Sequence, residues 1–305
     1  MKNYNIIVIL GATATGKTRL AANLAAFINT EIISADSRQV YRDMNIGTGK
    51  DLGEYLVNDV KIPYHIIDVV AAGSDYHLHA YLQDFKKAFE HITAQNKMPI
   101  LCGGTGMYMD AALKGFEYTG IPVDQDLRER LQPLTLAELQ EIFLNIPPTA
   151  YHLVADTSTA KRTLRAIEIA TWLGKNEMEK NNLPLLNSLI FGLSANLESR
   201  RKKIELRLKQ RLNNGLVDEV KQLLANGVTT EKLLFYGLEY KFIVKYLNNE
   251  ITYDYLVAHL TVAIQQFAKR QMTYFRKMED DGFKINWINA DLTLEEQLEV
   301  VKGLL

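Results

Sequence analysis

The sequence predicts an α/β fold in which a parallel sheet is flanked by helices and a helical segment is inserted into the core. Three observations lead to this prediction. Short apolar runs with strand character alternate with segments of helical spacing in the N-terminal part of the chain. The middle of the chain is polar, has leucines at helical spacing and is divided by prolines. Strand character then returns ahead of two long helical stretches.

Apolar segments are predicted to be strands at residues 6–10, 31–34, 64–69, 99–102, 188–193 and 284–288. An amphipathic helix is expected at 77–95, longer helical stretches at 197–226 and 253–279, and a terminal helix after the last strand. Strands that alternate with helices are typical of a parallel sheet with right-handed crossovers. Such a sheet binds its ligand at the carboxyl ends of the strands.

Prolines mark the predicted insertion. Its helices are separated by Pro122, Pro133, Pro147, Pro148 and Pro184. The predicted core comprises residues 1–115 and 188–305, and the predicted helical insertion domain comprises residues 116–187. A chain of 305 residues is long enough for one sizeable core with a second domain inserted into it.

The composition is that of a soluble globular protein, with 47% hydrophobic and 23% charged residues and a formal net charge of −1. No apolar run reaches membrane-spanning length, and the N-terminal residues lack a signal-peptide pattern. The single cysteine, Cys102, excludes an intrachain disulfide and suits a reducing compartment. We therefore expect a cytoplasmic monomer without a membrane partner, in which Cys102 is a small buried hydrophobe rather than a nucleophile.

Basic residues are concentrated locally, although the net charge is close to zero. Residues 200–211 carry seven Lys and Arg side chains, opposed only by Glu205. The other clusters are Lys161-Arg162 with Arg165, and Lys269-Arg270 with Arg276-Lys277. Each cluster by itself is equally consistent with a solvated helix face. Three of them in a chain that also has a phosphate-binding loop favour a polyanionic substrate.

The segment GATATGKT has the G-x-x-x-x-G-K-[ST] spacing of a phosphate-binding loop, and it lies between a predicted strand and a predicted helix. We call residues 11–18 the phosphate loop; they are Gly11, Ala12, Thr13, Ala14, Thr15, Gly16, Lys17 and Thr18. Backbone N–H groups at a helix N-terminus bind an anion, Lys17 adds a cation, and the Thr18 hydroxyl is a candidate Mg²⁺ ligand.

This loop makes the predicted core P-loop NTPase-like. It identifies only a diphosphate-like anion, so kinases, NTPases and enzymes that expel a phosphate group all remain possible. The alternative is an ordinary glycine-containing turn between a strand and a helix.

Polar residues follow other predicted strands at the same edge of the sheet. Asp36 is the first carboxylate after the second strand and is a candidate proton acceptor, or alternatively the cap of a following helix. Thr105 opens a second glycine-rich strand–helix junction, GGTG, where its hydroxyl is expected to line a channel. Asp68 is either a carboxylate on the Mg²⁺ side, of the NTPase kind, or a structural residue that holds a loop amide.

The order of motifs resembles that of the tRNA dimethylallyltransferases, also called tRNA isopentenyltransferases. The motifs are GATATGKT, SADSRQVYRDMNIGTGK, GGTGMY, LRAIEI, IELRLKQRLNNGLVDEV and FAKRQMTYFR, and they extend from the first strand to the last long helix. The resemblance implies transfer of a dimethylallyl group from dimethylallyl diphosphate. The acceptor it implies is the N6 amine of the adenosine immediately 3′ of the anticodon, in tRNAs that read codons beginning with U.

The resemblance also assigns roles to individual residues. It makes Asp36 the general base, places Thr105 in the channel where amine and donor meet, and has Lys17 and Arg207 hold the diphosphate together with Mg²⁺ at Thr18. The target adenine is expected to leave its stack and enter the channel. The residues implied to contact the tRNA anticodon stem-loop are Asp36, Ser37, Arg38, Gln39, Lys161, Arg162, Thr163, Leu164, Arg165, Lys269, Arg270 and Gln271.

The chain departs from the usual family pattern at a few positions. Asp51 replaces a usual proline, YGLEYK from Tyr236 replaces a Gly-Tyr-Lys-Glu arrangement, and Gln265 stands where arginine is common. The segment ahead of Arg165 is also altered. These positions face the tRNA in the family, so they bear on the range of tRNAs more than on the chemistry.

Three other functions are considered. An adenylate isopentenyltransferase would prenylate a free nucleotide on the same core, but it needs neither the helical insertion nor three basic clusters. A small-molecule or nucleoside kinase leaves SADSRQVY and GGTGMY without a role. A non-catalytic RNA-binding protein that uses a bound nucleotide as a switch would not need Lys17, Thr18 and Asp36 together, so their presence argues against it.

Overall fold

The computed structural model describes residues 4–178 and 184–305. These residues form two compact units. The larger unit contains the chain up to Lys114 and again from Pro184 to Leu305, and the smaller unit begins at Gly115. No helix formed by the described residues is both long enough and apolar enough to cross a membrane.

A six-stranded parallel sheet forms the centre of the larger unit, which confirms the predicted α/β class. Its strands, in spatial order, are β5 (Tyr64–His65), β2 (Ile32–Ala35), β6 (Ile100–Gly103), β1 (Ile6–Gly11), β7 (Ser188–Ser194) and β8 (Ile285–Asn289). β1 is buried along its whole length, because it lies within the sheet and helices cover both faces. The register pairs Leu10 with Gly103 and Ala35 with Gly103, so the residues after β1, β2 and β6 emerge at one edge.

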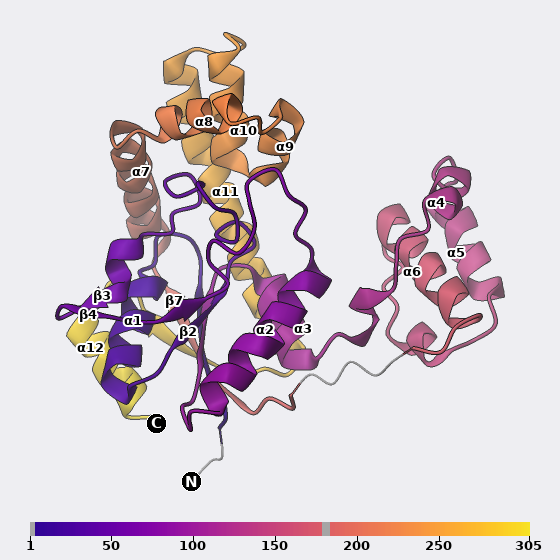
Figure 1. The fold of residues 1–305 in the computed structure, drawn as a ribbon, viewed down its shortest axis with the longest axis horizontal. Helices are drawn as coiled ribbons and strands as arrows, with labels where there is room; N and C mark the ends of the chain where they lie inside the picture. The colour runs from indigo at the N-terminus through magenta and orange to yellow at the C-terminus, as the bar shows by residue number, and fades with distance from the viewer. Residues whose placement is uncertain (1–3, 179–183) are drawn as a thin grey trace. The chain divides into compact units, whose positions relative to one another are not determined.

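Helices cover both faces of the sheet. α1 (Lys17–Ile28) and α12 (Leu294–Lys302) pack together on one face, while α2 (Leu78–Thr93) and α3 (Gly106–Lys114) lie on the other (Figure 1). α1 buries Leu20, Ala21, Leu24 and Ala25 in the core that it shares with β1, β6 and β7. A 3₁₀ turn (Leu52–Tyr55) and a small hairpin of β3 (Leu56–Val57) and β4 (Val60–Lys61) also pack against α1.

A second group of helices stands beyond the carboxyl edge of the sheet. It consists of α7 (Leu197–Asn213), α8 (Leu216–Ala225), α9 (Thr230–Tyr236), α10 (Leu238–Leu247) and the long α11 (Tyr253–Asp280). In Figure 1, α8, α9 and α10 gather around the first half of α11, whose second half runs down toward α3. This group forms a wall opposite the strand ends.

The structure corrects two of the predicted elements and adds others. The strand predicted over 64–69 ends at His65, because Ile66 and Asp68 adopt positive φ angles of 63° and 58° and leave the sheet. The helix predicted over 197–226 is two helices, because Gly215 has a φ of 94° and starts a new one. α9 and α10 fall in a segment for which the sequence analysis predicts no element, although its buried residues Leu233, Tyr236, Tyr240 and Val244 have helical spacing.

The smaller unit is helical. It contains α4 (Gln125–Leu131), α5 (Leu136–Asn145), α6 (Ala160–Leu173) and two 3₁₀ turns, Glu117–Gly120 and Ala150–Leu153. α5 and α6 pack through Leu139, Phe143, Ala166, Ile167 and Ala170. This unit begins within a residue of the predicted start of the insertion, and the chain is back in the larger unit before Ser188.

Candidate active site

A cavity of about 1040 Å³ opens at the carboxyl edge of the sheet, between the strand ends and the group α7 to α11. Its lining includes Lys17, Thr18, Asp36, Thr105 and Arg207. Although they come from four separate parts of the chain, all of these residues line the same cavity. Also on its surface are Thr13, Ala14, Gly16, Ser37, Arg38, Gln39, Arg270 and Gln271.

The phosphate loop joins β1 to α1. Gly16 precedes α1 with a φ of 85°, a left-handed conformation that glycine adopts without steric cost. The Lys17 ammonium donates a hydrogen bond to the Ala12 carbonyl at 2.8 Å, which holds the loop in a closed turn. Among the described residues, the half-buried Thr18 hydroxyl has no hydrogen-bond partner, so it is available to a ligand in the cavity.

The surroundings of Lys17 shift the pKa of its ammonium. The pKa of its ammonium is lowered to about 8, mainly by burial and also by the nearby Arg207, while Cys102, Asp36 and Asp51 act in the opposite direction. An amine with this pKa still carries its charge at neutral pH. Because that charge is poorly solvated, an anion that enters the cavity gains a strong electrostatic partner.

Asp36 is held in one orientation. Its Oδ1 accepts hydrogen bonds from the backbone N–H groups of Arg38 at 2.9 Å and Gln39 at 3.4 Å. No helix follows β2, so the carboxylate caps a turn rather than the helix considered in the sequence analysis. Within the described residues Oδ2 has no hydrogen-bond partner, which leaves this oxygen open to a proton donor in the cavity.

Thr105 fixes the chain just beyond Asp36. Its hydroxyl accepts a hydrogen bond from the Ser37 N–H at 3.1 Å and donates to the Ser37 hydroxyl at 3.4 Å. The backbones are in close contact here, because a Cβ on Gly103 would lie 2.2 Å from the Ala35 carbonyl oxygen. Gly103, the first glycine of GGTG, therefore allows β6 to run directly against the start of the Asp36 turn.

Arg207 of α7 reaches the cavity floor. Its guanidinium donates to the Thr13 hydroxyl at 3.3 Å and to the Gly49 carbonyl at 3.5 Å, and it forms an ion pair with Asp51. It therefore lies beside the phosphate loop, as an anion-binding arginine must. Asp51 is the residue that stands in place of the usual family proline, and in this chain it is the partner of that arginine.

The sequence profile of IPP transferase matches residues 39–278. The chain belongs to the IPP transferase family. It is 49% identical over 302 residues to tRNA dimethylallyltransferase 2 of Bacteroides fragilis, a match that covers 99% of this chain and 98% of that protein. It is 48% identical over 305 residues to tRNA dimethylallyltransferase 1 of Parabacteroides distasonis, covering 100% of this chain and 99% of the relative.

The fold is also shared with a solved structure. The tRNA isopentenylpyrophosphate transferase from Bacillus halodurans superposes with a TM-score of 0.71 at 26% identity, and the match covers 99% of this chain and 95% of that one. The family resemblance inferred from the ordered motifs is thereby confirmed.

One clamp involves a residue of the IELRLKQRLNNGLVDEV motif to which the sequence analysis assigns no role. The Glu219 carboxylate of α8 accepts three consecutive backbone N–H groups: from Asn45 at 2.8 Å, from Ile46 at 2.6 Å and from Gly47 at 3.0 Å. The Tyr240 hydroxyl donates to the same carboxylate at 2.8 Å. This clamp holds the loop that carries Gly49 and Asp51, so it determines where the partners of Arg207 lie.

Gln271 of α11 is a structural bridge. It is one of the residues that the family resemblance assigns to tRNA contact, yet it is buried. Its Oε1 accepts from the Thr13 N–H at 2.9 Å, and its Nε2 donates to the Gly104 carbonyl at 2.8 Å. The amide therefore ties the phosphate loop to the GGTG turn, and both of its ends are used within the protein.

We expect Gln271→Leu to destabilise the protein by about 2 kcal/mol, because the buried Gly104 carbonyl and the part-buried Thr13 N–H each lose their partner, and a buried backbone group without a partner costs about 1–3 kcal/mol. The Michaelis constant for the diphosphate donor should rise with it, since the phosphate loop loses its tether. Gln266→Leu, at an exposed position of the same helix, is the matched control. Chemical denaturation and donor-dependent kinetics measure both effects, and equal behaviour of the two variants would contradict the bridging role.

Asp68 and Cys102 have structural environments. Asp68 does not line the cavity; it forms an ion pair with Lys50, whose buried ammonium also donates to the Tyr41 carbonyl at 2.8 Å. This favours the structural alternative for Asp68, with Lys50 rather than a loop amide as its partner. Cys102 is buried and burial raises its thiol pKa to about 12, which agrees with the predicted role of a small apolar residue.

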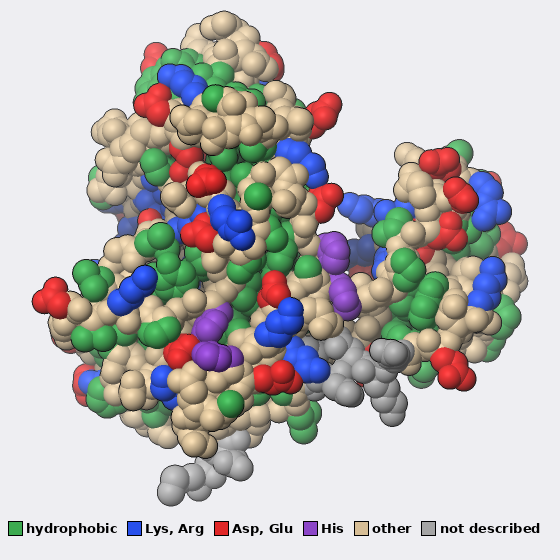
Figure 2. Space-filling view, viewed as in Figure 1, with side chains coloured by type: hydrophobic (Ala, Val, Ile, Leu, Met, Phe, Trp, Pro, Cys, Tyr) green, Lys and Arg blue, Asp and Glu red, His purple; other side chains and the backbone are tan. Residues whose placement is uncertain are grey.

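Several basic side chains of these clusters pair with acidic neighbours. In α7, Lys203 pairs with Asp291 at 2.8 Å and Lys209 with Glu205 at 2.7 Å, whereas Arg207 and Arg211 turn toward the cavity. Figure 2 shows the same pattern over the face it presents, where basic and acidic side chains are interspersed. Lys269 is exposed outside the cavity lining, beside Arg270, which is part of that lining.

In the smaller unit, some basic residues make contacts inside the unit and others are exposed. The Arg165 guanidinium donates to the Ile121 carbonyl at 2.6 Å and pairs with the buried Glu168 at 3.0 Å, which Arg128 also binds through two hydrogen bonds. Arg162 pairs with Asp156 at 2.7 Å, and Thr163 is buried. Lys161 is exposed and, within the described residues, has no ion-pair partner.

Proposed function

We propose that this protein transfers a dimethylallyl group from dimethylallyl diphosphate to the N6 amine of the adenosine immediately 3′ of the anticodon. The tRNAs are those that read codons beginning with U, and the products are N6-dimethylallyladenosine and diphosphate. One observation carries the proposal: the phosphate loop and the open oxygen of Asp36 face the same cavity. An anion site next to a proton acceptor is what this transfer needs. The names of the relatives support the same activity.

The reaction is a substitution at the allylic carbon of the donor. The N6 lone pair forms the new C–N bond as the C–O bond to diphosphate breaks, and the departing diphosphate keeps the electron pair. The proton released from N6 passes to Asp36. Lys17, Arg207 and the backbone N–H groups of the phosphate loop stabilise the charge that develops on the leaving group.

Alignment is the second contribution of the protein. An exocyclic adenine amine is a poor nucleophile, so holding it in line with the allylic carbon contributes much of the rate. Thr105 and the turn of residues 36–39 form the wall where the base would enter. The base must leave its stack to reach Asp36, and the cavity volume is large enough for a nucleobase together with a small diphosphate.

Mg²⁺ fits the donor end of the cavity. The Thr18 hydroxyl lines this cavity beside Lys17 and has no protein partner among the described residues, as a metal-ligating hydroxyl requires. We assign Thr18 as the protein ligand that holds Mg²⁺ when the diphosphate is bound. The ion would neutralise part of the diphosphate charge and so make it a better leaving group.

The proposed macromolecular partner is the tRNA anticodon stem-loop, bound in the cytoplasm by a monomer. Ser37, Arg38 and Gln39 stand next to Asp36, where the nucleotides around the target would lie. Arg270 also lines the cavity, and its neighbour Lys269 faces outward. Lys161–Arg165 belong to the smaller unit, for which we propose a contact with the tRNA stem.

A single incubation series tests this function. Labelled dimethylallyl diphosphate is mixed with the protein and bulk tRNA, with AMP, or without an acceptor, and a parallel reaction contains ATP and nucleosides. We expect label only in tRNA, and it should be found as N6-dimethylallyladenosine after digestion. Label in AMP would identify an adenylate isopentenyltransferase, phosphorylated nucleoside would identify a kinase, and tRNA binding without transfer would leave an RNA-binding protein.

Replacing Lys161 tests the role of the smaller unit. We expect Lys161→Ala to raise the Michaelis constant for tRNA about three- to five-fold and to reduce the salt dependence by about one counterion, a slope change of roughly 0.7–0.9. The Michaelis constant for the donor should not change. Lys175→Ala, at another exposed position of this unit, is the control. An unaltered salt slope in Lys161→Ala would mean that this lysine belongs to a solvated face.

A further inference from the structure

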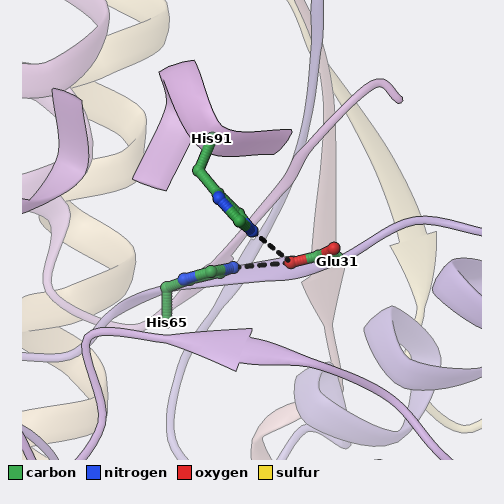
Figure 3. Close-up of side chains that lie close together, drawn as sticks. All are labelled: Glu31, His65 and His91. Atoms are coloured by element: carbon green, nitrogen blue, oxygen red, sulfur yellow. Dashed lines mark hydrogen bonds and ion pairs between the residues drawn. The ribbon is translucent and has the colours of Figure 1, made fainter. Parts of the chain in front are cut away.

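Two histidines and a glutamate converge at the amino-terminal edge of the sheet, at the opposite end of the strands from the cavity. Glu31 immediately precedes β2, His65 ends the edge strand β5, and His91 lies in the last turn of α2. Figure 3 shows both imidazole rings directed at the same carboxylate. The His65 Nε2 is 2.7 Å and the His91 Nε2 4.0 Å from Glu31 Oε2.

We propose that Glu31, His65 and His91 form a binding site for a divalent transition-metal ion, with Zn²⁺ as the best match. One ligand atom from each residue lies within 4.8 Å of the other two. Two imidazoles and one carboxylate are a common three-residue ligand set for Zn²⁺, with a water molecule as the fourth ligand. This site is independent of the proposed prenyl transfer.

The movement needed to bind the ion is small. Zn²⁺ takes nitrogen ligands at about 2.0–2.1 Å and carboxylate oxygens at about 2.0–2.2 Å, so a tetrahedral site places its ligand atoms roughly 3.3 Å apart. His65 is already closer than this to Glu31, and His91 must approach. The His91 side chain is 61% exposed, so it has room to rotate, and its open side leaves space for a water ligand.

The glutamate is suited to a cation. Its side chain is only 7% exposed. Both of its oxygens already meet nitrogen groups, Oε2 the His65 Nε2 at 2.7 Å and Oε1 the Lys97 ammonium at 3.3 Å. His65 is half-buried, and its Nε2 already meets the Glu31 carboxylate. His91 is exposed, and its Nε2 lies 3.0 Å from the Gln95 side-chain amide, a hydrogen bond that metal binding would replace.

Lys97 is the feature that opposes a metal. Its ammonium lies 3.3 Å from the other oxygen, Glu31 Oε1, and it also donates to Gln95 Oε1 at 2.9 Å. A carboxylate has enough lone pairs to bind an ion through Oε2 while Oε1 keeps this hydrogen bond. Lys97 then hydrogen-bonds the other oxygen of the ligating carboxylate and orients it toward the ion. The competing interpretation is a network that only neutralises a buried glutamate.

A metal here would fasten the weakest edge of the sheet. β5 has two residues and pairs only with β2, in the register Ile32 with Tyr64 and Ile33 with His65. An ion held by all three side chains would join β5, the start of β2 and α2. Binding to the folded chain alone raises its thermal stability by mass action.

The test is titration of chelator-treated protein with ZnCl₂ in excess Mg²⁺, which saturates hard oxygen sites such as the one proposed at Thr18. Wild type should bind one Zn²⁺ per chain and show a higher melting temperature with the ion. His91→Ala removes an exposed ligand and should weaken binding at least about ten-fold. His65→Ala should do the same, and Co²⁺ should give the visible absorption of a tetrahedral nitrogen and oxygen site.

His79→Ala is the matched control, because His77 and His79 form another close histidine pair, with ring centroids 6.3 Å apart. This variant should bind Zn²⁺ as wild type does. Each variant is first checked for an unchanged melting temperature in chelator, which separates loss of a ligand from loss of fold. No saturable binding by wild type, or equal affinity in wild type and His91→Ala, would overturn the site and leave a charge network around Glu31.

Discussion

Asp36→Asn is expected to lower kcat for prenyl transfer about 10²- to 10⁴-fold, the range that removal of a general base produces. Asparagine retains Oδ1, which accepts the Arg38 and Gln39 N–H groups, so the turn should keep its shape. The substitution converts the open Oδ2 into an amide NH₂ that cannot accept a proton. The affinities for tRNA and donor should therefore stay within a few-fold of wild type.

Single-turnover transfer and a melting curve measure this prediction together. Asp36→Ala is the informative companion, because it removes both the proton acceptor and the turn cap, so its stability should fall as well as its activity. Normal stability with near-normal transfer in Asp36→Asn would remove Asp36 from the catalytic residues. Alignment and stabilisation of the leaving group would then account for the rate.

Lys17→Ala is expected to reduce kcat/KM for the donor about 10²- to 10³-fold, as loss of one preorganised partner of a developing anion does. In the proposed function the ammonium contacts the diphosphate both before and after the C–O bond breaks, so donor affinity and the rate of transfer should fall together. Donor titration and single-turnover kinetics separate these effects. Unchanged donor affinity and transfer, with a loss of ATP hydrolysis instead, would contradict the prenyl-donor function.

The pH dependence of donor binding follows from the same lysine. Burial lowers the pKa of Lys17 to about 8, so the ammonium is charged below this pH and loses its proton as the pH rises through it. We expect kcat/KM for the donor to decline above pH 8 in wild type. Lys17→Arg keeps its charge at every accessible pH, so its lower activity should show no such decline. A parallel decline in both enzymes would assign the titration to another group.

Local patterns account for most of what the sequence analysis predicted. The phosphate loop, the strands at 6–10 and 99–102 and the helix of residues 253–279 are each encoded by neighbouring residues, through glycine spacing or apolar periodicity. Parallel topology follows from the alternation of such elements. This is why the sequence predicts residues 17, 36 and 105 at one edge of the sheet.

The limits of prediction lie in contacts between distant residues. Asp51 was identified only as a departure from a family pattern, and the structure shows it bound to Arg207 of α7. The positive φ angles that end β5 at His65 likewise belong to a loop tied down by the Lys50–Asp68 pair. Periodicity reports which face of an element is buried, but it does not report which remote side chain meets it.

The class of fold, the anion-binding loop and the candidate acid and hydroxyl at the strand ends can be inferred from the sequence, because they depend on residues close together in the chain. The Glu219 clamp on residues 45–47 and the inward-facing Gln271, which joins Thr13 to Gly104, become visible in the folded chain. The tertiary structure also separates the structural Arg165 from the exposed Lys161 in one basic run. A hydrogen bond between distant residues depends on where the fold places each side chain, and no local pattern carries that information.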